Sequence, residues 1–153
     1  MAMTLLALEP KAANYDIRIL ASDIDPQVVA TARAGQYHER DLGGMPAAMR
    51  ERFMRPARGG AAGLVEVAPE ARALISFREL NFNGPWPMRR PFDIVFCRNV
   101  VIYFDLETQH RAWSNLARVI EPGGWLYIGH SERLSGPAES GFSAAGTTTY
   151  KRR

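Results

Sequence analysis

Two aspartates, Asp23 and Asp25, lie two positions apart between a short apolar stretch and a helical pattern. The apolar stretch ends at residue 21 and is rich in aliphatic side chains, which predicts a buried parallel strand that closes at Asp23. Asp25 precedes Pro26 and apolar residues at helical spacing, so it is predicted to cap a helix. Capping explains Asp25 and leaves Asp23 without a structural role. Because a carboxylate at such a strand end commonly binds ribose hydroxyls, Asp23 is a candidate for binding a nucleotide-like ligand.

Polar side chains also follow the other predicted strands. Asn81 comes after the alternating segment 75–80, and Arg98 and Asn99 come directly after the apolar segment 92–97. In open α/β sheets, ligands lie outside the carboxyl ends of the strands. A carboxylate, an amide and a polar pair there could hold a ribose, an adenine edge and an amino-acid moiety without acid–base chemistry. Polar residues also end strands because they favour turns, and that alternative stays open for each position.

Other reactive side chains carry weaker signals. Cys97, the single cysteine, lies in an apolar segment and is predicted to be a small buried residue rather than a nucleophile or a metal ligand. His130 and Ser131 have no partners that would complete a catalytic triad, so their segment, GHSE, is interpreted as a turn at a strand end. No metal site is predicted. A nicotinamide-dependent oxidoreductase would also use an acid after its second strand, but the G-x-G-x-x-G pattern is absent.

Strands and helices alternate along the chain. Strands are predicted to end at residues 23, 80, 97 and 130, with a helix near 4–8, another starting at Pro26, and a third over 106–120 capped by Asp105. Residues 141–151 are predicted to form a terminal antiparallel hairpin. The segment 40–70, with its glycine-rich RPARGGAAG and alternating LVEVAP, is predicted to be an insertion. This order predicts an α/β fold with a doubly wound sheet.

Composition narrows the class of protein. The 153 residues, 46% hydrophobic and 23% charged, fit one globular domain. No stretch is apolar enough to span a bilayer and no signal peptide is evident, so no membrane insertion and a cytoplasmic location are expected. The net charge of +3 comes mostly from scattered arginines, which does not predict a nucleic-acid surface. The denser group at residues 50–58 is either a solvated face or a contact for an acidic protein partner.

Three segments resemble the S-adenosylmethionine-binding domain of CheR-type chemotaxis receptor methyltransferases: ILASDIDPQVVATARAGQY, FDIVFCRNVVIYFD and GGWLYIGHSERL. A fourth, RFMRPARGGAAGLVEV, resembles the small β-subdomain of that family. The resemblance implies a Rossmann-like methyltransferase sheet and transfer of a methyl group from S-adenosylmethionine to glutamates in the cytoplasmic signalling region of a chemoreceptor. It also implies a role for each matching residue: Asp23 at the ribose, Asn81 and Phe82 bordering the adenine, Arg98 and Asn99 along the cofactor, and Tyr103 close to the reacting methyl.

The chain also departs from the family pattern. The family's first strand and glycine-rich turn have no counterpart here, so residues 1–153 are expected to be a partial S-adenosylmethionine-dependent methyltransferase domain with a β-subdomain over 40–70. Loss of that strand predicts low stability and little activity. Arg55 and Arg58 are expected to bind the receptor. The alternative is a truncated, catalytically impaired module that binds the receptor or the cofactor.

Overall fold

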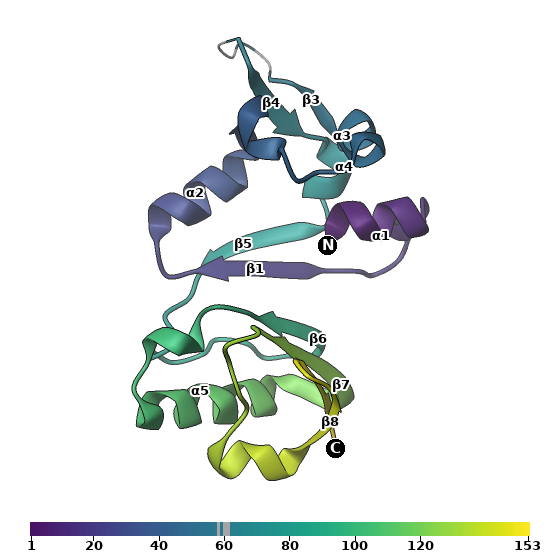
Figure 1. Ribbon diagram of the computed structural model, residues 1–153. Coiled ribbons are helices and arrows are strands. Elements are labelled where there is room, and N and C mark those ends of the chain that lie inside the picture. The colour runs from purple at the N-terminus through teal and green to yellow at the C-terminus, as the bar shows by residue number, and fades with distance from the viewer. Residues whose placement is uncertain (58, 60–61) are drawn as a thin grey trace. The chain divides into compact units, whose positions relative to one another are not determined.

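The chain divides into two compact units, Met1–Leu80 and Asn81–Arg153. The computed structural model describes residues 1–57, 59 and 62–153 (Figure 1). Each unit has its own cluster of buried apolar side chains, one centred on Phe53 and Leu6 and the other on Trp113 and Leu126. The helices and strands therefore pack locally within each unit.

A parallel pair of strands carries the first aspartates. Strand β1 (Ile19–Asp23) pairs with β5 (Ile75–Glu79), with Asp23 opposite Glu79, and its side chains are half-buried to exposed rather than fully buried as expected. Helix α2 (Pro26–Ala34) follows β1, and the Asp25 side chain caps it, as predicted. The helix ends at Gly35, whose φ of 66° is left-handed and therefore suits glycine.

A three-stranded antiparallel sheet lies in the same unit. It has the order β2 (Gln36–His38), β4 (Leu64–Val67), β3 (Met54–Pro56), which puts β4 in the centre. The sheet corresponds to the predicted insertion but starts before residue 40, because Tyr37 pairs with Val65 on β4. Helix α3 (Ala47–Phe53) leads into β3 and buries Phe53 completely.

The second unit is built on a four-stranded sheet with the order β6-β7-β9-β8. Strand β6 (Phe92–Cys97) runs parallel to β7 (Ile120–Ile128). The predicted terminal hairpin is present as β8 (Phe142–Gly146) and β9 (Thr149–Arg152), and β9 joins it to β7. Within the described residues, β6 has one partner strand and is therefore an edge.

Helix α5 (Leu106–Val119) covers one face of this sheet and buries Trp113 and Leu116 against Leu126 (Figure 1). The opposite face of β6 carries Ile94 and Phe96, which are 51% and 49% exposed in this structure. Strand β6 is thus buried on one face and exposed on the other. Phe96 stacks on Tyr127 of β7, with ring centroids 4.7 Å apart.

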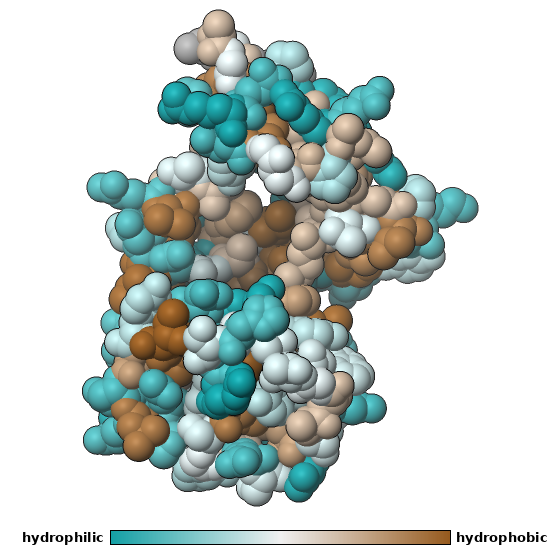
Figure 2. All heavy atoms as spheres, in the orientation of Figure 1, coloured by the Kyte–Doolittle hydropathy of each residue, from teal (hydrophilic) through white to brown (hydrophobic). Residues whose placement is uncertain are grey.

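Short elements complete the two units: α1 (Ala2–Leu8), η1 (Ala12–Asn14), η2 (Glu39–Leu42), α4 (Pro69–Arg72), η3 (Val101–Tyr103) and η4 (Gly136–Gly141). In the described part of the chain, no helix combines the length and the apolar character needed to cross a bilayer. Figure 2 shows apolar side chains scattered among polar ones on the face that it presents.

Candidate functional site

Asp23 is the last residue of β1, and its exposed carboxylate forms one hydrogen bond within the chain. Its Oδ1 accepts a hydrogen bond from the Asp25 backbone N–H at 3.0 Å, which closes a tight turn before α2. Its Oδ2 has no partner among the described residues. Asp25 Oδ1 in turn accepts from the Gln27 N–H at 2.7 Å, as an N-cap does. Asp23 therefore has a structural role that the sequence did not predict, and still presents a free acceptor.

Asn81 and Phe82 begin the second unit at a turn. The Asn81 Oδ1 accepts from the Asn83 N–H at 2.9 Å, and this orients the side chain with its NH₂ group outward. The Phe82 ring meets the Trp86 ring edge-on with centroids 4.9 Å apart and lies 6.3 Å from the Phe104 ring. Phe82 is thus a partly buried aromatic residue with a fixed orientation, beside an amide that is free to donate.

Residues 98–103 form the loop between β6 and α5, and it holds three of the predicted site residues. Arg98 is exposed, and no described residue forms an ion pair or a hydrogen bond with its side chain. Asn99 has a φ of 61°, the left-handed conformation that few residues other than glycine adopt. Tyr103 is 80% exposed, so it is not the half-buried tyrosine that a purely structural role predicts.

Glu132, in the segment GHSE, is the residue that sequence reasoning missed. Its side chain is only 3% exposed, and its two carboxylate oxygens accept hydrogen bonds from four backbone N–H groups. Three of these N–H groups belong to Asn99, Val100 and Val101 in the 98–103 loop. A glutamate between two turn residues and an arginine gives no sequence signal of burial, because burial here depends on a partner loop about thirty residues away.

Cys97 ends β6 inside the second core. Its side chain is 3% exposed, and burial, followed by the charge of Glu132, raises the pKa of its thiol to about 12. The thiol therefore stays protonated at neutral pH, which agrees with the predicted structural role. Among residues 1–57, 59 and 62–153, no group of three or more His, Cys, Asp or Glu side chains is arranged to hold a metal ion.

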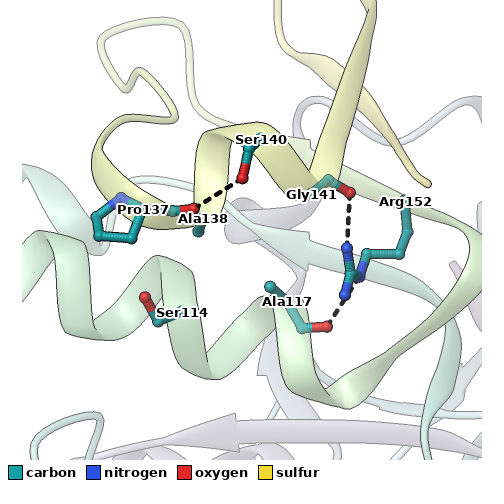
Figure 3. A pocket seen from close by; sticks show the side chains of 7 residues that line it. All are labelled: Ser114, Ala117, Pro137, Ala138, Ser140, Gly141 and Arg152. Carbon is teal, nitrogen blue, oxygen red and sulfur yellow. Dashed lines mark hydrogen bonds between the residues drawn. The ribbon is translucent and has the colours of Figure 1, made fainter.

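A hollow of about 370 Å³ lies between α5 and η4 (Figure 3), and the residues that line it lie outside the loop that follows β6. Its polar side chains are used internally. Arg152 donates to the carbonyl of Ala117 at 3.2 Å and to that of Gly141 at 2.8 Å, and Ser140 donates to the carbonyl of Pro137. These bonds satisfy carbonyl groups at the end of α5 and in η4, so the polar side chains that line the hollow have structural roles.

Arg55 is the described candidate for receptor binding, and its side chain contacts residues close to it in the same unit. Its Nη1 donates to the carbonyl of Arg52 at 2.9 Å, near the end of α3, and its Nη2 lies 3.8 Å from a carboxylate oxygen of Glu70. The side chain is 47% exposed, so part of the guanidinium stays accessible. Arg58 lies outside the described residues.

Comparison with known proteins decides the family. A family model described as "CheR methyltransferase, SAM binding domain" matches residues 1–151. The chain belongs to the CheR methyltransferase family. A probable chemotaxis protein methyltransferase of Rhizobium etli is 45% identical over 151 residues, an alignment covering 99% of this chain and 56% of that protein. The chemotaxis protein methyltransferase of Klebsiella aerogenes is 40% identical, with 87% of this chain and 46% of that protein covered.

The chain spans about half the length of the curated relatives it matches. A solved N-methyltransferase, NodS of Bradyrhizobium japonicum, is similar at 13% identity and a TM-score of 0.49, covering 88% of this chain and 73% of that one. Membership of the CheR family confirms the predicted resemblance and the α/β methyltransferase fold class, and the family description names the predicted cofactor, S-adenosylmethionine.

The groups at the strand ends of this CheR-family chain suit the chemistry of S-adenosylmethionine. A ribose has hydroxyl donors, and Asp23 offers a free carboxylate oxygen. An adenine edge carries ring nitrogen acceptors, and the Asn81 NH₂ group is a donor because its carbonyl oxygen is already bonded. A sulfonium is a cation, and the exposed ring of Tyr103 is a face that attracts cations. The assignment of each residue to a part of the cofactor stays a prediction.

Proposed function

We propose that this protein transfers a methyl group from S-adenosylmethionine to glutamate side chains in the cytoplasmic signalling region of a chemoreceptor, and that it acts in the cytoplasm. The observation that carries the proposal is the match of residues 1–151 to the CheR methyltransferase family. The relatives that cover most of this chain are named chemotaxis protein methyltransferases, which supports the same substrate class.

The reaction requires little acid–base catalysis from the protein. S-adenosylmethionine supplies an electrophilic methyl group on a sulfonium sulfur, which a glutamate carboxylate accepts as a methyl ester. Glutamate is ionised at neutral pH, so no base is needed to activate it, and catalysis comes from alignment and exclusion of water. Tyr103 would stand beside the reacting centre, where its ring attracts the sulfonium charge. Asp23, Asn81, Phe82, Arg98 and Asn99 would bind and orient the cofactor.

The test is methyl incorporation into a purified receptor cytoplasmic fragment, with tritiated S-adenosylmethionine and with methanol released by alkali as the signature of a glutamyl ester. Transfer by this chain supports the proposal, and no transfer should occur to a receptor fragment whose acceptor glutamates are replaced by glutamine. Tyr103→Ala should slow transfer by about two- to thirtyfold, the cost of losing a cation–π contact, while Tyr103→Phe stays near the wild-type rate. Tyr15→Ala, at another exposed tyrosine, is the matched control.

Calorimetry with S-adenosylhomocysteine separates the alternatives. Binding together with transfer supports the enzyme. Binding without transfer favours the impaired binding module that the sequence also allows. A chain that neither binds S-adenosylhomocysteine nor transfers a methyl group contradicts the enzyme and leaves only a module that binds the receptor.

Arginines of the 50–58 group are proposed to contribute to receptor binding. The support is the partly accessible guanidinium of Arg55, which carries a charge that an acidic receptor surface would attract. Exposed charges are screened beyond about 8–10 Å at physiological salt, so receptor affinity should fall with added salt, and Arg55→Ala or Arg58→Ala should weaken that dependence. Arg89→Ala is the control at an exposed arginine outside the group. Affinity that neither salt nor these variants changes would contradict the receptor contact.

A further inference from the structure

The buried carboxylate of Glu132 is the least expected feature of the second unit. Its Oε1 accepts from the N–H groups of Val100 and Val101, both at 2.9 Å. Its Oε2 accepts from Asn99 N–H at 3.2 Å and from Gly129 N–H at 2.6 Å. A carboxylate taken out of water at this depth is costly unless its oxygens are bonded, and here both oxygens are bonded twice.

These four bonds connect two turns that are distant in sequence. Three of the amides are consecutive, from Asn99 to Val101, and point at one carboxylate because Asn99 is left-handed. The fourth amide, of Gly129, follows β7 at the neighbouring strand end. The Glu132 N–H also donates to the Gly129 carbonyl at 3.1 Å, which fixes the turn that carries the carboxylate. Hydrogen bonds from backbone amides to one side chain thereby connect the ends of the neighbouring strands β6 and β7.

The same bonds determine where the loop places its functional side chains. Arg98 immediately precedes the bonded amides, and Tyr103 lies two positions after the last of them. Both side chains are exposed and so receive little orientation from packing. The left-handed conformation of Asn99 is uncommon for a residue with a Cβ, although asparagine adopts it more readily than most. Of the contacts described, the Glu132 carboxylate is the one that bonds directly to the Asn99 backbone N–H.

We infer that Glu132 is the positioning residue of the 98–103 loop: its carboxylate, by binding the amides of Asn99, Val100, Val101 and Gly129, sets the loop conformation on which affinity for S-adenosylmethionine depends. This inference rests on the proposed function for the identity of the ligand. Glu132 touches neither cofactor nor substrate in this role, and acts through the backbone that carries Arg98, Asn99 and Tyr103.

Two variants test the inference in the full chain. Glu132→Gln keeps the length of the side chain but replaces one acceptor oxygen with an NH₂ donor, which faces backbone donors and cannot bond to them. Gly129→Ala keeps the charge and displaces it, because a Cβ there would lie 2.8 Å from Glu132 Oε2 and 3.1 Å from Asn99 N. If Glu132→Gln fails to fold, Gly129→Ala carries the test. Leu116→Ala, in the core of the same unit, is the control for lost stability alone.

Amide hydrogen exchange and calorimetric titration with S-adenosylhomocysteine are the measurements. In the ligand-free variants, we expect exchange to accelerate at residues 99–101 and 129 while the amides of α5 stay protected. The dissociation constant should rise by about tenfold to a hundredfold, the cost of losing one hydrogen bond between a charged group and the ligand. Leu116→Ala should instead lower the melting temperature and the binding stoichiometry while the dissociation constant stays unchanged.

Each outcome of these measurements decides one point. Faster exchange confined to these amides with weaker binding supports the positioning role. Faster exchange with an unchanged dissociation constant overturns it, as does a variant that only lowers the stoichiometry, like Leu116→Ala. A wild-type chain that shows no binding contradicts the proposed function, and unchanged exchange in the variants separately overturns the role of Glu132 in the loop.

Discussion

Asp23 and Asp25 share one turn, yet each binds a different backbone amide. Asp23 closes the turn by accepting from the Asp25 N–H, and Asp25 caps α2 by accepting from the Gln27 N–H. In each carboxylate the second oxygen has no partner among the described residues, so the two aspartates differ in position: Asp25 lies at the start of a helix and Asp23 at the end of a strand. The cap and the binding group can therefore be separated by substitution.

The substitution Asp23→Asn keeps an oxygen for the Asp25 N–H and replaces the free oxygen with NH₂. We expect the melting temperature to stay near the wild-type value and affinity for S-adenosylhomocysteine to fall by about tenfold to a hundredfold, the usual cost of losing a hydrogen bond to a charged group. Asp25→Ala is the converse variant, which should cost about 0.5–2 kcal/mol of stability and leave affinity unchanged. Titration calorimetry and thermal melts of both variants check this, and equal effects on both quantities would contradict it.

Among the elements, helix α5 is capped by the residue that precedes it. Asp105 accepts a hydrogen bond from the Thr108 N–H at 2.8 Å, and this bond holds the pKa of the carboxyl below its ordinary value. The folded protein therefore keeps Asp105 ionised at pH values where the unfolded chain binds a proton. The stabilisation is complete above the ordinary carboxyl pKa and is lost as pH falls through the lower value of the folded state.

The variant Asp105→Asn isolates this titration, because asparagine also caps helices well but carries no ionisable group. From about pH 6 to about pH 4, the melting temperatures of wild type and variant should run in parallel. Below about pH 4 the wild type should lose stability more steeply. Circular dichroism melts across this range measure the difference. Parallel curves down to about pH 2 would show that the cap does not depend on the charge of Asp105.

Most elements were predictable because their signals are local. The pair Asp25-Pro26 predicts the start of α2, and Asp105 predicts the start of α5. Turn residues within 141–151 predict the terminal hairpin. Strand β2 was missed because it has only three residues and forms through pairing with β4, nearly thirty positions away. The one-sided exposure of β6 was missed for a similar reason, since an apolar strand shows its own hydropathy and not what covers each face.

The candidate site shows the same division. Strand-end positions located Asp23, Asn81, Arg98 and Asn99, because the end of a strand is visible in the sequence. The role of Tyr103 came from family resemblance. Glu132 could not be found in this way, because its importance lies in four amides supplied by two turns.

At the scale of the whole molecule, each of the two units has a separate core, although the composition fits one domain. Phe53 and Leu6 are buried in the first unit, and Trp113 and Leu126 in the second. Sequence patterns identify which residues are apolar, but the division of these residues between two cores depends on contacts formed only on folding. Asp23 belongs to the first unit, and the other predicted cofactor-binding residues belong to the second.

The single cysteine allows the unfolding of the second unit to be measured separately from that of the first. Cys97 is buried, and its thiol has a pKa of about 12, so a thiol reagent at neutral pH modifies it only in molecules whose second core has opened. Its modification rate, relative to that of a free thiol, measures the fraction of time that β6 is exposed. The first unit contains no cysteine. If the first unit melts while Cys97 stays unreactive, the two cores unfold independently.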